Sequence, residues 1–158
     1  MSAVIINPER VISRAHNIAR LEIPFVHQGR NLHGIDCVGL LAWVLEYTGE
    51  LPPYPRDPVN GELERYLEEV LGPPELTFSK AKRMTADDVG LLRPCDIVSM
   101  QYKGPIRHVG LLVPYEPDIR HLSLVHTDSD VGRTTECILD SFWTPRIMRV
   151  WRPQVETA

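Results

Sequence analysis

GIDCVGLLAWVLEY, residues 34–47, is the stretch that decides the fold of this chain. After Asp36, apolar residues recur at the spacing that places them along one face of a helix. These residues are Val38, Leu41, Val44 and Leu45. A Thr-Gly pair at 48–49 and a Pro-Pro pair at 52–53 end the pattern. We therefore predict a helix that begins at Cys37 and has Asp36 as its N-cap.

Cys37 would lie in the first turn of that helix. Unpaired backbone N–H groups and the positive end of the helix dipole favour a thiolate there, and the same N–H groups could bind an oxyanion. A lone cysteine beside an apolar helix is more often a small buried hydrophobe than a nucleophile. As a nucleophile, Cys37 is expected to have a lowered pKa and to be the most readily alkylated of the three cysteines.

The length, net charge and hydropathy of the chain indicate how many domains to expect and which partners to exclude. The 158 residues are enough to bury a core, and we expect one domain over residues 1–158. A net charge of −4 and a pI near 5.8 give no electrostatic reason to expect nucleic acid or an anionic membrane as partner. No apolar run approaches membrane-spanning length, and the uncharged apolar start at residues 1–6 does not resemble a secretory signal peptide. The well-separated cysteines are typical of a protein made and folded in a reducing cytosol.

Predicted helices precede predicted strands along the chain. One helix should begin after Asn7, with Pro8 at its first position, and end before Pro24. Another is indicated by Leu63, Leu67, Val70 and Leu71 and closed by Gly72. After a capping-box-like start at Thr85 and Asp88, β-type runs follow at 96–100, 108–113, 122–127, 134–139 and 147–151. This order favours an α+β fold in which N-terminal helices pack on an antiparallel sheet of about five strands.

Two of the six histidines lie in predicted strands. His108 opens one strand and His126 closes the next, and either could be a satisfied strand residue. The other four are interpreted as structural or solvated, with possible supporting roles for the two that flank Cys37: His16, His27, His33 and His121. A cysteine at a helix start, a histidine on one strand and a polar residue on the next form a papain-like arrangement.

Four short motifs, in this order, resemble those of NlpC-type cell-wall cysteine peptidases. They are GxDCxGL at 34–40, LRPCDIV at 92–98, HVGL at 108–111 and VH at 125–126. The resemblance implies that Cys37 is the nucleophile, His108 the general base and His126 the residue that orients His108. It also implies a papain-like fold, cleavage of amide bonds in peptidoglycan stem peptides, often next to D-glutamate, and no metal or other cofactor.

Three further segments resemble the phage-tail and gene-transfer-particle branch of that family. They are PFVHQ at 24–28, PY at 53–54 and TECILDSFWTPRI at 135–147. The resemblance implies a tail-tip component of a phage or phage-like particle that helps to penetrate the cell wall. Its partners would be tail hub or tail-tip proteins, and it would act at the periplasm or cell wall after synthesis in the cytoplasm.

The sequence departs from the family pattern at two positions. Where the family usually has a tyrosine whose hydroxyl faces the oxyanion, this chain has Phe25, so that His27 or Gln28 would have to help the Cys37 N–H bind the oxyanion. Asp36 could contact substrate, although capping explains it with less. Cys95 replaces a glycine before the first strand of the sheet, and because glycine tolerates a positive φ that cysteine does not, we expect a different turn.

Alternatives remain at this point. One is a structural tail-tip protein on the same fold with weak or no activity, which Phe25 favours. Another is an acyl-transfer enzyme of the same superfamily that uses another amide or ester. A zinc site built from the cysteines and histidines is disfavoured because no two of them have the spacing of a local ligand pair. Trp43, Trp143 and Trp151 are interpreted as packing aromatics.

Overall fold

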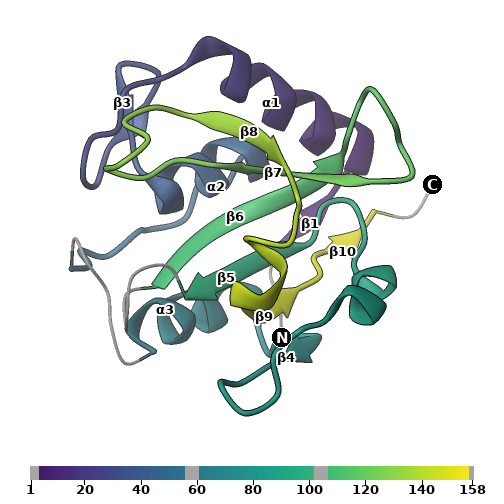
Figure 1. Ribbon diagram of the computed structural model, residues 1–158. Helices are drawn as coiled ribbons and strands as arrows, with labels where there is room; N and C mark the ends of the chain where they lie inside the picture. Colours follow the sequence, from purple (N-terminus) through teal and green to yellow (C-terminus); the bar gives the residue numbers. More distant parts are fainter. Residues whose placement is uncertain (1–3, 56–60, 102–106, 157–158) are drawn as a thin grey trace.

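A six-stranded antiparallel sheet forms the centre of the molecule (Figure 1). The computed structural model describes residues 4–55, 61–101 and 107–156. The strand order is β4-β9-β5-β6-β7-β8. The strands are β4 (Leu76–Thr77), β5 (Ile97–Gln101), β6 (Arg107–Pro114), β7 (Leu122–His126), β8 (Thr135–Ile138) and β9 (Ile147–Trp151). The α+β class and the five predicted strands are confirmed. The edge strand β4 was not predicted, because two residues are too few to show a periodic pattern.

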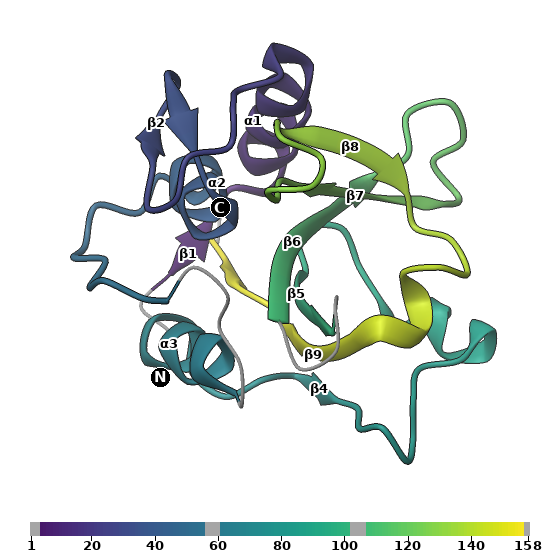
Figure 2. The same ribbon diagram turned by 60° about the vertical axis from the view of Figure 1, so that its left-hand side comes forward.

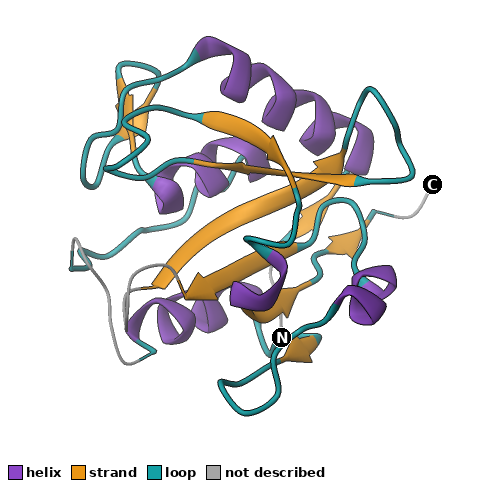
Figure 3. Cartoon of the chain, viewed as in Figure 1, coloured by secondary structure: helices purple, strands orange, loops and turns teal. Residues whose placement is uncertain are grey.

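The helices gather mainly at one side of this sheet (Figure 3). They are α1 (Pro8–Leu21), α2 (Cys37–Leu45), α3 (Glu62–Leu71) and two short 3-10 turns, η1 (Ala86–Leu91) and η2 (Thr144–Arg146). Helix α1 packs against α2 and against β6, β7 and β8, while α2 packs against β6. The predicted helix starts are confirmed: the Asn7 side chain accepts a hydrogen bond from the N–H of Arg10, and Asp36 caps α2. The sequence therefore places the N-terminus of α2 against β6.

Two small sheets complete the frame, and neither was predicted. Strand β1 (Ile5–Ile6) pairs in parallel with β10 (Gln154–Val155), which brings the two ends of the described chain side by side (Figure 2). Strands β2 (Arg30–Asn31) and β3 (Gly34–Ile35) form an antiparallel hairpin that leads into α2. A Cβ at Gly29 would lie 2.3 Å from the carbonyl oxygen of Gly34, so this hairpin depends on glycine at its base.

The buried apolar residues form two clusters on the two faces of the sheet, because successive strand residues face opposite sides. On β6, Val109 and Leu111 belong to the helix-side cluster, while Leu112 belongs to the other one. Trp143 and Trp151 are buried in these clusters, as predicted for packing aromatics. Within the described part of the chain, no helix combines the length and the hydrophobicity needed to cross a bilayer.

The turn before β5 keeps a left-handed residue although that residue is not glycine. Cys95 has φ 74°, so the expectation that cysteine would avoid a positive φ was wrong. Its N–H donates to the carbonyl of Leu112 at 2.7 Å, and the Asp96 side chain accepts from the N–H of Arg93 at 2.9 Å. These bonds, together with burial of the Cys95 side chain, hold the residue in a conformation that L-residues rarely adopt.

Glycine at position 95 is expected to give a more stable protein than alanine there, by about 1 kcal/mol in free energy of unfolding. Both Cys95→Gly and Cys95→Ala lose the buried sulfur, but only glycine removes the strain of the positive φ. Chemical denaturation of the two variants measures the difference. Equal stability, or the usual advantage of alanine, would show that the backbone here is not strained.

Candidate active site

Asp36 fixes the place where α2 begins. Its carboxylate is buried and accepts hydrogen bonds from the N–H of Gly39 at 2.8 Å and the N–H of Gln28 at 2.7 Å. It also accepts from the guanidinium of Arg30 at 3.1 Å and from the hydroxyl of Tyr54. One side chain thus joins the helix, the loop before it, the β2–β3 hairpin and the connector after α2. The predicted cap is confirmed, and the further partners stabilise the start of α2.

The Cys37 thiol lies at the end of the contact between β6 and β7. The N–H of Val109, the residue after His108, lies against the thiol. Along a strand, the backbone N–H groups of successive residues point alternately toward the two neighbouring strands. The N–H of Leu112 donates to Asp96, on the β5 side. The N–H of Val109, three residues earlier, therefore points toward β7. The pairing with β7 stops at Leu111 and Val125. The Cys37 thiol therefore takes the position beside β6 that a longer β7 would have filled.

The thiol of Cys37 is held in its neutral form. Burial and, to a lesser extent, the negative charge of Asp36 raise its pKa to about 12. The N–H groups of Val109, Val38 and Cys37 itself act in the opposite direction but do not compensate. The expectation of a lowered pKa at the helix N-terminus was therefore wrong, because desolvation outweighs the helix dipole.

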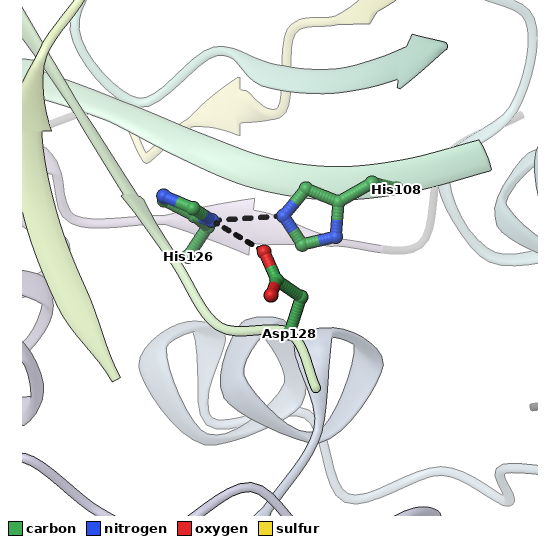
Figure 4. A group of neighbouring side chains, drawn as sticks. All are labelled: His108, His126 and Asp128. Carbon is green, nitrogen blue, oxygen red and sulfur yellow. Dashed lines mark hydrogen bonds and ion pairs between the residues drawn. The ribbon is translucent and has the colours of Figure 1, made fainter. Parts of the chain in front are cut away.

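The side chains of His108 and His126 are hydrogen-bonded to each other (Figure 4). Nε2 of His108 lies 2.9 Å from Nδ1 of His126, and both rings are buried. The indole of Trp143 packs against both rings, with centroids 6.1 Å from His108 and 5.1 Å from His126. Burial lowers the pKa of His108 well below its usual value and that of His126 to about 4. At neutral pH both imidazoles are uncharged.

The structure adds Asp128 to this group. Its Oδ2 lies 3.8 Å from Nδ1 of His126, and Figure 4 shows the carboxylate turned toward the pair. Asp128 follows β7 in the segment VHTD, residues 125–128, and the sequence pattern there indicates only a turn residue. Nothing in its spacing distinguishes it from other acids in turns, so sequence reasoning missed it.

Cys137 also lies next to His126, which was not predicted. Its Sγ lies 3.8 Å from Nε2 of His126, although the sequence suggested no histidine partner for it. Burial raises the pKa of the Cys137 thiol to about 11, and a hydrogen bond from Trp143 lowers it to a smaller extent. The two nitrogens of His126 thus face His108 on one side and Cys137 on the other.

The residues predicted to assist at the oxyanion lie in the loop beside α2. Phe25 is half-buried, and its backbone bridges to Ile35. His27 packs edge-on against Tyr54 with ring centroids 5.8 Å apart, and the Gln28 amide donates to the carbonyl of Tyr54 at 3.3 Å. Burial and the neighbouring Asp36 raise the pKa of Tyr54 well above its usual value. Tyr54, which appeared in the sequence only as part of a connector, therefore organises this loop.

The remaining histidines lie outside this group. His16 on α1 is buried, and its Nδ1 lies 2.7 Å from Glu136 and 3.4 Å from Glu116. His33 and His121 are exposed. Among the described residues, two sets of three side chains bring donor atoms within 4.8 Å of one another, namely His108, His126 and Asp128, and His16, Glu116 and Glu136. We assign no metal to either, since hydrogen bonds and ion pairs already account for the contacts of all three histidine rings.

Burial of His126 should make the free energy of unfolding depend on pH. In the unfolded chain a histidine binds a proton below about pH 6.5, whereas folded His126 does so only near pH 4. The folded state therefore loses stability as pH falls from about 6.5 toward 4, by about 3 kcal/mol for this residue. Denaturation at several pH values should show a smaller loss for His126→Gln than for wild type.

A matched control is His121→Gln, because His121 is exposed. That variant should keep the wild-type dependence on pH. An unchanged dependence in His126→Gln would mean that His126 is not buried as a neutral ring.

The arrangement has the parts that covalent acyl transfer requires. A thiol at a helix start, with backbone N–H groups around it, lies beside the strand that carries His108, and that imidazole is hydrogen-bonded to His126. A sequence model of the NlpC/P60 family matches residues 22–152 of this chain. A search of curated proteins returned no match.

Proposed function

Because the chain belongs to the NlpC/P60 family, we propose that it is a cysteine hydrolase that cleaves amide bonds in peptidoglycan stem peptides. The observation that carries the proposal is the Cys37 thiol against the N–H of Val109, next to a His108 that is bonded to His126. Zymography with purified sacculi from several hosts tests it, with Cys37→Ala as the inactive control.

The hydrogen bond between the two histidines supports an assignment of roles. Nε2 of His108 is engaged with His126, so Nδ1 is the ring nitrogen that accepts the proton of the Cys37 thiol. This role requires the tautomer in which His108 carries its hydrogen on Nε2 and donates it to His126. The sulfur attacks the scissile carbonyl as His108 takes its proton, the leaving amine then takes that proton from His108, and water hydrolyses the resulting thioester.

Both partners of the proton transfer are neutral at rest. The raised pKa of Cys37 and the lowered pKa of His108 disfavour a stable thiolate–imidazolium pair. The proton therefore moves as the thiol attacks, and His108 acts as a general base in the transition state. Reactivity toward small alkylating agents is accordingly expected to depend on His108.

Phe25 decides how much of the oxyanion stabilisation the chain retains. The N–H of Cys37 lies in the first turn of α2, but the phenyl ring offers no donor. Losing one oxyanion donor typically costs about 3 kcal/mol, or roughly a hundredfold in rate. Phe25→Tyr is expected to raise kcat with little change in KM, since such a contact strengthens mainly in the transition state. Steady-state kinetics on a soluble stem peptide measures both constants.

A neutral or harmful effect of Phe25→Tyr would mean that another donor already serves the oxyanion. If wild type and Phe25→Tyr are both folded and both inert on sacculi from several hosts, the structural alternative gains. An acyl-transfer role would instead appear as a product that carries the acyl group on an acceptor other than water.

The proposal includes the place of action. The protein would be a tail-tip component of a phage or phage-like particle, made in the cytoplasm and delivered to the cell wall with tail hub or tail-tip proteins. The support is the resemblance of PFVHQ at 24–28 and of the segment at 135–147 to that branch of the family. Mass spectrometry of purified particles for peptides of this chain tests the assignment.

A further inference from the structure

One carboxylate oxygen of Asp128 is buried and accepts no hydrogen bond from the backbone of the turn that follows it. Oδ1 accepts two backbone hydrogen bonds, from Asp130 at 2.7 Å and from Val131 at 2.8 Å. Oδ2 is buried and has no hydrogen-bond partner among the described residues. The turn is thus satisfied by one oxygen, while the other faces the histidine pair at 3.8 Å from Nδ1 of His126.

An arrangement of this kind is unfavourable unless the oxygen acquires a partner. A buried acceptor without a hydrogen bond destabilises the folded state, and a carboxylate more than a neutral group. The turn alone would be served equally well by asparagine, which keeps an oxygen for the two N–H groups. The negative charge therefore points to a role beyond the turn.

The histidine pair is the group that would benefit from that charge. Burial disfavours a proton on either ring, and His126 further disfavours one on His108. The Cys137 thiol and the Asp128 carboxylate face His126, while the Cys37 thiol lies against the N–H of Val109, the residue after His108, and is acted on by Asp36 from the helix start. Of the influences on His126, Asp128 is the one that raises its pKa.

We propose that Asp128 is a positioning residue of this site, whose carboxylate stabilises the positive charge that the His108–His126 pair acquires when His108 takes the proton of the Cys37 thiol. This inference rests on the proposed function. The S–H bond of Cys37 breaks and an N–H bond forms at Nδ1 of His108, which leaves a thiolate and one positive charge on the pair. The Nε2–H of His108 remains bonded to Nδ1 of His126, and the carboxylate 3.8 Å from that nitrogen lowers the energy of the charged pair.

Removal of the charge, without removal of the oxygen that holds the turn, tests the inference. Asp128→Asn should slow alkylation of Cys37 by iodoacetamide at neutral pH about tenfold, because the proton transfer to His108 that accompanies the attack becomes less favourable. It should also move the titration of the His126 ring, followed by NMR, to lower pH. Neither readout requires that the substrate be known.

Asp140→Asn is a matched control. Asp140 also closes a turn with Oδ1, which accepts from the N–H groups of Phe142 at 3.0 Å and Trp143 at 3.3 Å, but it is exposed. This variant removes the same charge from the same kind of turn, and because Asp140 acts on Cys137 and not on either histidine, it should change both readouts much less than Asp128→Asn does. In a His126→Gln background, Asp128→Asn should lose most of its effect, as expected for a residue that acts through His126.

The outcomes separate this inference from the proposed function. If wild type hydrolyses no stem peptide but Asp128→Asn still slows alkylation, the function fails and the role of Asp128 stands. If Asp128→Asn changes only the free energy of unfolding, with alkylation and ring titration as in wild type, Asp128 is a turn residue and the inference is wrong. Should Asp128→Asn not fold, Asp128→Ser, which keeps a hydroxyl oxygen for the turn, repeats the test.

Discussion

Cys37→Ala is expected to abolish hydrolysis of peptidoglycan, with kcat lower by about ten-thousandfold or more. The methyl side chain cannot form the thioester, and the remaining N–H groups at the helix start can only bind the carbonyl. Initial rates on a soluble stem peptide measure the loss, and the far-ultraviolet circular dichroism spectrum should match that of wild type.

Cys95→Ala serves as its control. Cys95 is also a free cysteine, but it is buried in the turn before β5 and its sulfur faces the carbonyl of Pro8. Its replacement should lower stability and leave kcat nearly unchanged. Equal activity in Cys37→Ala and wild type would remove the nucleophile from the account.

His108→Ala is expected to lower kcat by about two to four orders of magnitude, because the thiol then lacks a proton acceptor. The loss should be large here because the pKa of Cys37 is raised to about 12, so that few molecules hold a thiolate without the base. His126→Gln keeps a polar group for Nε2 of His108 and should cost less. The comparison of the two variants on one substrate separates a base from an orienting residue.

Near-wild-type activity in His108→Ala, together with an inactive His126→Gln, would reverse the two roles. A large loss in both, with no change in Cys37 alkylation in either, would place the catalytic base elsewhere.

The parts of the fold with a local sequence pattern were predicted well. Asn7 and Asp36 cap their helices as expected, because capping depends on a side chain and the few residues that follow it. The strands of the main sheet longer than two residues were also found at their predicted places, since each is a short apolar run between turn residues. The two-residue strands, such as those that join the chain ends, carry no such pattern.

The electrostatics of the site depend on contacts between distant residues and could not be predicted. The sequence shows Cys37 at a helix start but does not show how strongly burial raises the pKa of its thiol. It shows His126 in a strand but places neither Asp128 nor Cys137 beside it. His108 and His126 were paired only through the family resemblance, and the antiparallel contact of β6 with β7 supplies the physical reason.

Mass spectrometry of the products released from purified sacculi by wild type and by Cys37→Ala tests the central claim most directly. The account predicts that wild type releases fragments with a new amine and a new carboxylate inside the stem peptide, and that Cys37→Ala releases none. Release of the same fragments by folded Cys37→Ala, or cleavage confined to the glycan strand, would contradict it.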